Sequence, residues 1–480
     1  MKLQTLALTS LALATSLILA PAQTPASASS GSTPPPEPEG FEAFSQKVKR
    51  PFDWLSLGAD LRVRNEYFKS AVSLSDANAL AEQDVIRIRG RFWATATVVT
   101  NLTVNARLAG EPREWIDPAF TGTRAGNTGM EWRYGILDSA NVKWDYIMDT
   151  PFSISGGRQD IMLGDFYDWW LVADGTPGDG SWTFFLDSVR LGYDAREIQT
   201  KVDLMYINQQ SDPGERMPTI GNSDDYYLTD QDEQGVVVYL SNKSMEKTQL
   251  DAYFMYKNDD PTRASSFDGE SYTTGGKVTG TPLDHWSYSV EGAYQFGQRA
   301  DRLYANRDVE AYGGKAKLSY LFKDSLKNQV YLGFEYLSGD DPTTPEDEMF
   351  DVLWGRWPRW SELYIYSFPN ETLGRIAQIN NLWRIGPTWS ISPLKGMTAS
   401  LGYNALFAPE QTPTRTPSAA AGTLFSNDGN FRGHYLQAIL KHQFNKHLSG
   451  HLWGEWVWQG DYYTQDEMMT FLRAEVMFTF

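Results

Sequence analysis

The feature that most constrains the fold is a two-residue alternation of apolar and polar side chains, which begins near Leu55 and recurs to the last residue, Phe480. In residues 286–296 the even positions are mostly aromatic or aliphatic, whereas serine, glutamate and glutamine occupy most of the odd ones. A helix would mix these two sets, because its side chains repeat every 3.6 residues rather than every two. The same alternation recurs at 101–108, 250–257, 316–320, 330–336, 397–407 and 448–458. The pattern therefore predicts an all-β protein.

The side chains on the apolar face favour a membrane over a soluble core. The 480 residues include 17 Trp, 25 Tyr and 24 Phe, yet hydrophobic residues make up only 41% of the chain. A transmembrane barrel accounts for both values, because its lipid face is one apolar layer flanked by aromatic girdles and its lumen is polar. After residue 20, no segment approaches the ~20 apolar residues of a spanning helix. We therefore expect a transmembrane antiparallel β-barrel in the bacterial outer membrane.

The spacing between alternating segments indicates how the strands are connected. Short links occur at 99–101, 148–151, 195–197 and 445–447, and longer stretches at 69–83, 111–129, 160–181, 209–234, 258–284 and 408–430. Short turns at one end and long loops at the other are expected when one end of a barrel faces the periplasm and the other the exterior. The segments predict 16–18 strands, including a weak one at 361–366.

The last segment carries the most specific local signal. Apolar residues occupy every second position from Leu472 to Phe480, where the chain ends. This arrangement resembles the signature that the outer-membrane barrel assembly machinery reads. We therefore expect that machinery as a partner, together with outer-membrane lipid and lipopolysaccharide.

The N-terminal residues have the features of an export signal. Lys2 precedes an apolar stretch at 3–20, and small residues follow it. Residues 1–28 are therefore predicted to be a signal peptide cleaved after Ala22 or Ala28, with an uncleaved membrane anchor as the alternative. Residues 29–54 are expected to form an extended, unpacked Pro-rich periplasmic lead, and residues 55–480 the barrel.

Composition removes several classes of site. The chain has no cysteine, which excludes disulfides and thiolate metal sites. The net charge of −18 says little about a lumen, because acid concentrates in the predicted loops and arginine on several strands. The acidic stretches 224–233 and 340–348 lack the spacing of a calcium loop, so a solvated surface or a divalent bridge to lipopolysaccharide is the favoured interpretation. We expect no metal, no cofactor and no nucleic acid.

Arginines gather on polar faces in the first half of the chain. Arg87, Arg89 and Arg91 occupy alternate positions, as do Arg62 and Arg64, so each set projects to one side of its strand, and lipid is the costly side. Further arginines on polar faces are Arg107, Arg133, Arg158 and Arg190. Such a wall would bind a polycarboxylate and pass it between weak sites. The alternative, compatible with the first, is bracing by lumen acids: Glu66, Asp145, Asp187, Asp203 and Glu335.

Two segments resemble the alginate export family of outer-membrane porins. The first runs through Gly156–Asp160 and Leu163–Asp165 to residues 185–191, and the second is 349–357. The resemblance implies a channel with an electropositive constriction that passes an anionic polysaccharide outward without hydrolysing it. Carried over by position, the residues that would line or shape the constriction are Arg158, Asp165, Asp187 and Arg190.

Arginines and tryptophans are interspersed in and just after segment 349–357. Arg356 and Arg359 lie close in sequence to Trp354, Trp357 and Trp360, and together they would offer stacking and charge to sugar rings. An interfacial aromatic cluster is the favoured alternative.

Two other functions stay open. A porin that takes up small anions or oligosaccharides would share every feature above and differ in the size of its cargo. An outer-membrane hydrolase would need a nucleophile near one of the five histidines, of which His451 shares a polar face with Glu455. No nucleophile elbow or metal-spaced motif marks such a site, so we expect a channel and not an enzyme. A periplasmic export partner is a further open alternative.

Overall fold

The computed structural model describes residues 40–77, 80–119, 126–133, 135–163, 173–174, 185–221, 227–263, 266–300, 306–355, 358–371, 379–411 and 424–480. The predicted signal peptide and both predicted cleavage positions lie outside these residues.

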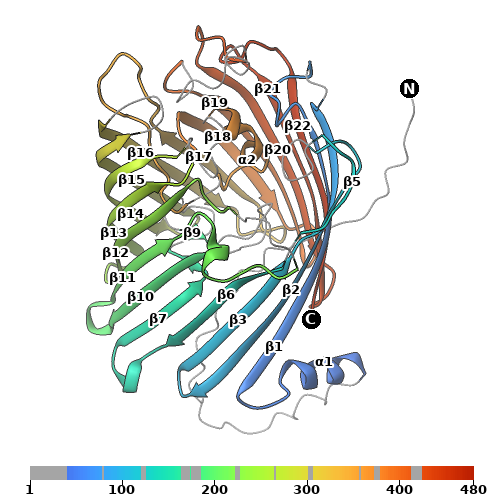
Figure 1. Cartoon of the computed structure of the whole chain (residues 1–480), viewed down its shortest axis with the longest axis vertical. Helices are drawn as coiled ribbons and strands as arrows, with labels where there is room; N and C mark the ends of the chain where they lie inside the picture. Colours follow the sequence, from blue (N-terminus) through green and yellow to red (C-terminus); the bar gives the residue numbers. More distant parts are fainter. Residues whose placement is uncertain are drawn as a thin grey trace.

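Within the described residues, eighteen antiparallel strands follow one another around a closed wall, which β22 (Met468–Thr479) completes by pairing with β1 (Leu55–Lys69) (Figure 1). The other wall strands are β2 (Glu82–Val99), β3 (Leu102–Gly110), β6 (Gly135–Trp144), β7 (Phe152–Gln159), β10 (Leu186–Ala195), β11 (Thr200–Gln209), β12 (Gln231–Asn242), β13 (Thr248–Pro261), β14 (Asp268–Leu283), β15 (Trp286–Ala300), β16 (Arg307–Leu321), β17 (Gln329–Leu337), β18 (Leu382–Ile391), β19 (Met397–Phe407), β20 (Phe431–Gln443) and β21 (Leu448–Gln459). The predicted barrel of 16–18 strands is confirmed.

Short elements accompany the wall. Two strands, β4 (Arg113–Trp115) and β5 (Gly129–Glu131), extend the sheet from β2, and β8 (Ile161–Met162) pairs with β9 (Ala173–Asp174). Three single turns of 3₁₀ helix are η1 (Ile147–Asp149), η2 (Arg196–Ile198) and η3 (Pro213–Glu215). The two α-helices of the described chain are α1 (Phe41–Lys49) and α2 (Leu363–Glu371), and neither is long and apolar enough to span a membrane.

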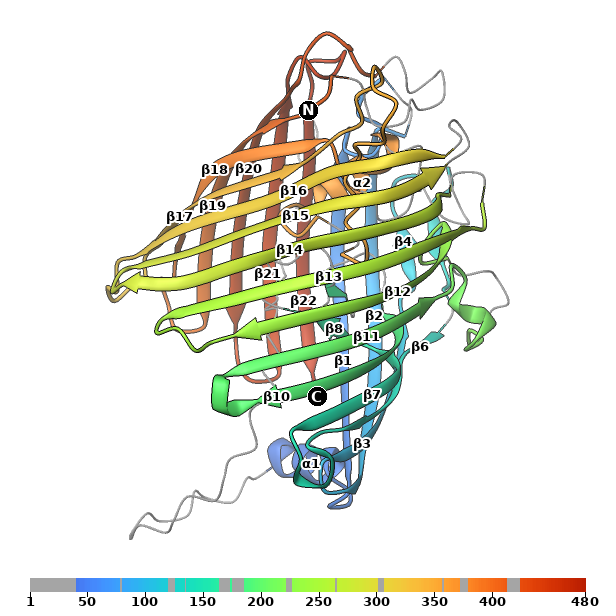
Figure 2. The ribbon, with the colours of Figure 1, turned by 90° about the vertical axis from the view of Figure 1, so that its left-hand side faces the viewer.

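The alternation in the sequence separates the two faces of the wall. On β1, Leu61 and Val63 are 50% and 40% exposed on the outside, whereas Arg62 and Arg64 are 1% exposed and point inward. Aromatic rings pack on the outer face of β14 and β15, where Tyr272 stacks on Phe296 with centroids 5.3 Å apart. The strands run obliquely across the wall (Figure 2), with short turns at one end and long connections at the other. This is the geometry expected of a barrel in a bilayer.

One wall strand, β14, was wrongly predicted as part of a long loop at 258–284. It pairs with β13 and β15 along most of its length, but it is rich in glycine and threonine and carries little apolar signal of its own. A side chain at Gly275 would collide with the ring of Tyr253 from the neighbouring strand. Because side chains of neighbouring strands fill this space, β14 carries glycine there, and its sequence resembles that of a turn.

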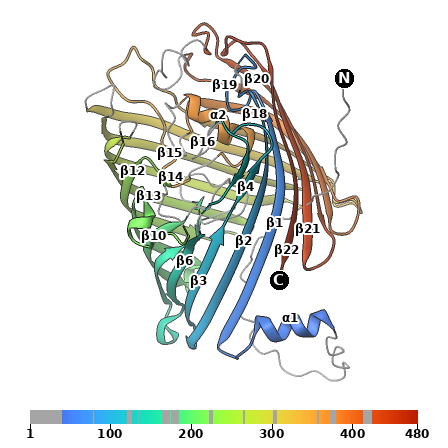
Figure 3. The same cartoon turned by 45° about the vertical axis from the view of Figure 1, so that its right-hand side comes forward.

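A second prediction is wrong in the opposite direction. The weak strand expected at 361–366 is instead the start of α2, which lies inside the barrel (Figures 1 and 3). The rings of Trp360, Tyr364 and Phe368, each four residues from the next, pack in sequence with centroids 5.1 and 5.2 Å apart. A four-residue aromatic spacing is helical and was the signal available for this segment.

The expected extended lead also contains a packed element. The helix α1 lies at the turn end of the barrel beside the start of β1 (Figure 3). Phe41 contacts the rings of Phe478 and Phe480 at centroid distances of 6.4 and 6.2 Å, and Glu42 pairs with Lys446. The lead is therefore not extended throughout, because the aromatic end of the chain offers α1 a surface to pack on.

Candidate functional site

The described parts of the long connection between β17 and β18, residues 338–355, 358–371 and 379–381, fold back into the barrel and cross its lumen. Its first half, around residues 347–354, attaches to β13 and β15, and its second half, which holds α2, attaches to the wall formed by β1, β2 and β20 to β22. Loops that fold into a barrel set the size and charge of its opening. We call residues 347–371 the crossing loop.

The first half of the crossing loop is held by charge and backbone contacts. Gln295 Nε2 donates to the carbonyl of Asp351 at 2.7 Å, and the Asp351 amide donates back to Gln295 Oε1 at 2.8 Å. Lys257 Nζ lies 3.4 Å from Asp351 Oδ2. Burial acts to raise the pKa of Asp351, but the positive charges of Lys257 and Arg299 outweigh it and hold that pKa below its ordinary value. Asp351 therefore anchors the loop as a carboxylate.

The second half is held at both ends of α2. At its start, Glu455 on β21 accepts hydrogen bonds from the hydroxyl of Ser361 at 2.7 Å and the amide of Leu363 at 2.9 Å. At its end, Glu371 pairs with the fully buried Arg432 at 2.6 Å. A carboxylate at a helix N-terminus satisfies amides that lack an intrahelical partner, so the wall fixes the position of α2.

Beneath α2 the arginines of β1 and β2 form a buried network with glutamates. Glu66 contacts Arg64 at 3.3 Å, Arg87 at 2.9 Å and Arg473 at 2.6 Å. Arg62 contacts Glu111 at 2.8 Å, and Arg87 pairs with the same carboxylate. The hydroxyl of Tyr366 on α2 donates to Glu66 at 3.4 Å, and burial together with Glu66 raises the pKa of Tyr366 to about 12. The predicted inward arginines Arg62, Arg64 and Arg87 are thus buried in a network that α2 contacts through Tyr366.

The remaining predicted site residues are spread over the wall. Arg89 and Arg91 share Asp60, at 3.7 and 2.5 Å, and Arg107 pairs with Asp138 and Asp160 at 2.7 and 2.8 Å. Arg158 is fully buried, pairs with Asp187 at 2.9 Å and donates to the carbonyls of Leu137 and Pro213. Arg190 pairs with Asp203 at 2.8 Å and keeps 33% of its side chain exposed. Asp165 lies outside the described residues.

The position expected for Arg133 is wrong. It follows β5 in the connection between β3 and β6 rather than lying on a wall strand, and it pairs with Glu131 at 2.7 Å. The nearest strand before it, β5, ends at Glu131, so Arg133 lies on no strand face.

Trp354 and Trp360, the tryptophans of the crossing loop that the structure describes, do not form an interfacial cluster. Trp354 is completely buried inside the barrel, and Trp360 packs against Tyr435 of β20 with centroids 5.0 Å apart. The guanidinium of Arg384 lies 4.8 Å over the ring of Trp360. Arg356 and Trp357 lie outside the described residues.

Under the crossing loop, β15 to β21 line a lumen cavity of about 390 Å³, which we call the upper cavity. Three pairs of a cation and an aromatic ring lie on its wall: Lys317 over Tyr331 at 5.0 Å, Lys441 over Trp453 at 5.3 Å, and Arg384 over Trp360. Lys315 and Arg359 also line it. Cations beside aromatic faces suit a ligand that has both carboxylates and apolar ring faces.

Arg359 and Trp360 were singled out in the sequence, but Lys315, Lys317, Lys441 and Arg384 were not predicted, because only the arginines in the first half of the chain were considered as lumen charges. Lys315 and Lys317 alternate with Ala316 and Leu318 in the same way that Arg87 and Arg89 alternate with Ile88. The rule that placed the arginines inward would have placed both lysines inward as well.

A closed eighteen-stranded barrel with an apolar outer face, a polar lumen and a loop folded into that lumen defines an outer-membrane channel. The chain belongs to the alginate export family, whose model matches residues 53–476. This confirms the family that the sequence motifs indicated.

Solved structures agree on the fold. OccK5 (OpdH) of Pseudomonas aeruginosa matches with a TM-score of 0.51 and 11% identity, over 88% of this chain and 97% of its own. OccAB3 of Acinetobacter baumannii matches with a TM-score of 0.52 and 10% identity, over 88% and 99%. A BenF-like porin from Pseudomonas fluorescens Pf-5 matches with a TM-score of 0.52 and 10% identity, over 88% of this chain and 98% of its own. A comparison with curated proteins found no match.

The family and the fold point to a channel rather than to an enzyme. The acid that a hydrolase would need beside His451 is Glu455, which instead accepts hydrogen bonds from the start of α2. Within the described residues, no group of three or more His, Asp or Glu side chains is arranged to hold a metal ion. Part of one acidic stretch considered for calcium, Asp224 and Asp225, lies outside those residues.

Proposed function

We propose that the chain passes an anionic polysaccharide of the alginate type, a polyuronate, across the outer membrane by passive diffusion. The observation that carries the proposal is the upper cavity, where three cations each lie over an aromatic ring. Each residue of a polyuronate has one carboxylate and apolar faces on its sugar ring. Cation and ring together therefore match the repeating unit of the cargo.

Passage requires that each site hold the cargo weakly and that several sites follow one another. Lysine suits this task, because its ammonium is a mobile, strongly hydrated point charge, whereas the planar fork of arginine binds a carboxylate in two places. Lys315, Lys317 and Lys441 supply such charges in the upper cavity. A chain could move along them without being trapped.

The arginines identified in the sequence have two roles in this proposal. Arg62, Arg64, Arg87 and Arg158 brace the wall and fix the loops that narrow the lumen. Arg91, Arg107 and Arg190 keep 15%, 15% and 33% of their side chains exposed, and they contribute positive potential along the passage. Barrel assembly by the outer-membrane machinery and delivery by a periplasmic partner are part of the same proposal.

The test is single-channel recording of the refolded protein in planar bilayers. We expect anion selectivity, and block by oligouronates but not by neutral oligosaccharides of equal length. Block by short carboxylates alone would support the uptake porin instead. Cation selectivity or the absence of oligouronate block would contradict the proposal.

A further inference from the structure

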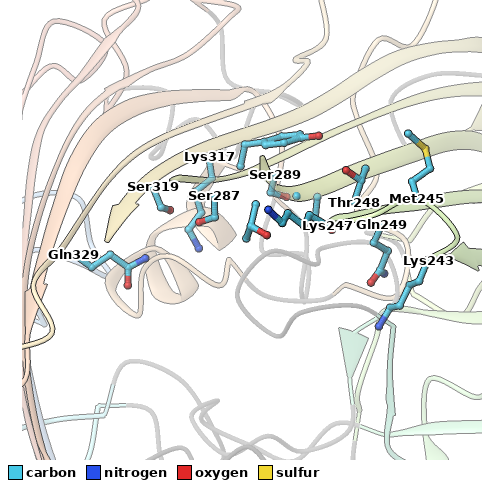
Figure 4. Close-up of a pocket in the computed structure, with 14 residues that line it drawn as sticks. Lys243, Met245, Lys247, Thr248, Gln249, Ser287, Ser289, Lys317, Ser319 and Gln329 are labelled. Atoms are coloured by element: carbon cyan, nitrogen blue, oxygen red, sulfur yellow. The ribbon is translucent and has the colours of Figure 1, made fainter. Parts of the chain in front are cut away.

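A second cavity, of about 560 Å³, lies in the lumen wall at the turn end of the barrel (Figure 4). We call it the lower cavity. Its lining comes from the turn between β12 and β13 and from the adjoining ends of β13 to β17. The short turns of such a barrel face the periplasm, so the lower cavity is at the periplasmic mouth.

The chemistry of the lower cavity is restricted to one kind of charge. Its charged lining residues, among those the structure describes, are Lys243, Lys247 and Lys317. The other polar lining side chains are hydroxyls and amides: Thr248, Gln249, Thr279, Thr281, Ser287, Tyr288, Ser289, Ser319 and Gln329. Hydroxyls and amides both donate and accept, as sugar hydroxyls do, and ammonium groups pair with carboxylates. The wall thus offers partners for both parts of a uronate residue.

The lower cavity adjoins the upper one. Ser289, Lys317 and Gln329 line both. Lysines therefore continue from Lys243 and Lys247 at the mouth, through the shared Lys317, to Lys315 and Lys441 beneath the crossing loop. Glu291 also lines the upper cavity, so the lysines, rather than the lining as a whole, form the continuous series that joins the two cavities into a path.

Acidic side chains gather at the opposite end of the lumen. The connection after β17 carries Asp340, Asp341 and Glu348, and the Glu410 side chain lies near them. Burial and these neighbouring acids raise the pKa of Glu410 above its ordinary value. Basic side chains at the periplasmic mouth therefore attract a polyanion, whereas the acids at the outer end, of which Asp340 pairs with Arg307 at 2.9 Å, do not.

We propose that the lower cavity is a loading site, where Lys243, Lys247 and Lys317 hold uronate residues of a polysaccharide chain before it reaches the upper cavity. The proposal rests on the proposed function, since it assumes a polyuronate cargo. It adds a binding step on the periplasmic side that the constriction alone does not supply.

The experiment measures block by a hexauronate added to one side of an oriented channel. The test variant is Lys243→Gln/Lys247→Gln, and its matched control is Lys327→Gln/Lys395→Gln, which removes two exposed lysines from other turns of the same rim. We expect the test variant to weaken block from the periplasmic side roughly fivefold or more, and block from the outer side much less. The control should leave both unchanged, and Lys243→Arg/Lys247→Arg should restore block.

The outcomes separate the two proposals. If the wild-type channel shows no hexauronate block from either side, the polyuronate function is wrong and the loading site with it. If the wild type is blocked but the test and control variants behave alike, the function stands and the loading site is wrong. All four lysines lie in turns rather than in wall strands, so the variants should fold like the wild type, and Lys317→Gln gives a second measure from a wall strand.

Discussion

Two walls of the same lumen carry basic side chains in opposite ways. On the wall of β1, β2 and β22, arginines are buried beneath α2 and share carboxylates at 2.6–3.3 Å. On the wall of β12 to β21, Lys257 and Arg432 are buried and hold the crossing loop, but the other lysines named above line two cavities and lie beside aromatic rings and hydroxyls. Both sets point inward and both follow the same two-residue period. The difference shows that pointing into a barrel does not by itself bring a side chain into contact with cargo.

The crossing loop accounts for much of this difference. Tyr366 on α2 contacts Glu66 in the arginine network, and Glu362 just before the helix pairs with Arg473 at 2.5 Å. An ion pair that is covered in this way loses its water and depends on its partners. On the other wall, the loop passes above the upper cavity and leaves space below it.

The largest effect should follow from removing the loop. Replacing residues 349–371 by a short Gly-Ser linker should raise the single-channel conductance several-fold, because the segment that crosses the lumen is gone. Lys257, Arg432 and Arg473 would lose partners, but they would then face water rather than protein. A Gly-Ser replacement of Thr343–Glu346, before the crossing loop, serves as the control and should leave conductance unchanged. Equal conductance in both variants would show that the loop does not limit the opening.

The next effect concerns stability and tests the arginine wall. Glu66→Gln would leave Arg64, Arg87 and Arg473 short of a buried carboxylate and should destabilise the barrel by about 3–5 kcal/mol. The control is Asp203→Asn, which breaks the partly exposed pair with Arg190 and should cost about 1 kcal/mol or less. Urea unfolding in lipid vesicles, followed by tryptophan fluorescence, measures both. Similar losses for the two variants would mean that the buried network is not a special brace.

The two walls also differ in how much of their structure the sequence predicts. The two-residue period predicted the barrel, its membrane, its short turns and long loops, and the inward direction of Arg62, Arg64 and Arg87. These features depend only on local alternation, which a single strand contains. The wall strand that was predicted as a loop, β14, is one where side chains of neighbouring strands, such as Tyr253, fill the space beside its glycines.

The site was harder to predict because it depends on contacts between distant segments. Glu66 and Arg473 are 407 residues apart, and Asp351 meets Gln295 across 56 residues. No local sequence pattern predicts that a loop will fold into the lumen and cover one side of the wall. The aromatic spacing of Trp360, Tyr364 and Phe368 is helical, although the segment was predicted as a weak strand, and it does not give the position of the helix in the barrel. The two-residue alternation also places the lysines of β16 inward, and they were not predicted only because arginine alone was considered.

A smaller effect should distinguish the walls by their charge. The triple variant Lys315→Gln/Lys317→Gln/Lys441→Gln should lower the permeability ratio of chloride to potassium roughly threefold, since three positive charges leave the edge of an open cavity. Arg64→Gln removes a covered charge, so it should lower stability and change the ratio little. Reversal potentials in a salt gradient measure both. If Arg64→Gln lowered the permeability ratio equally, the buried arginines would also contribute to the electrostatic potential along the ion path.

The smallest effect should come from the aromatic partner. Trp360→Leu keeps an apolar side chain but removes the ring beneath Arg384, so the residence time of a bound oligouronate should shorten by about two- to fivefold, the equivalent of 0.5–1 kcal/mol. The matched control is Trp389→Leu on the outer face of β18, where the ring faces lipid and is 44% exposed. Because both substitutions remove one indole from the same barrel, a general loss of rigidity would shorten residence in both. A change confined to Trp360→Leu would mean that the upper cavity recognises sugar rings as well as charge. Equal residence times in the two variants would mean that it binds the oligouronate by charge alone.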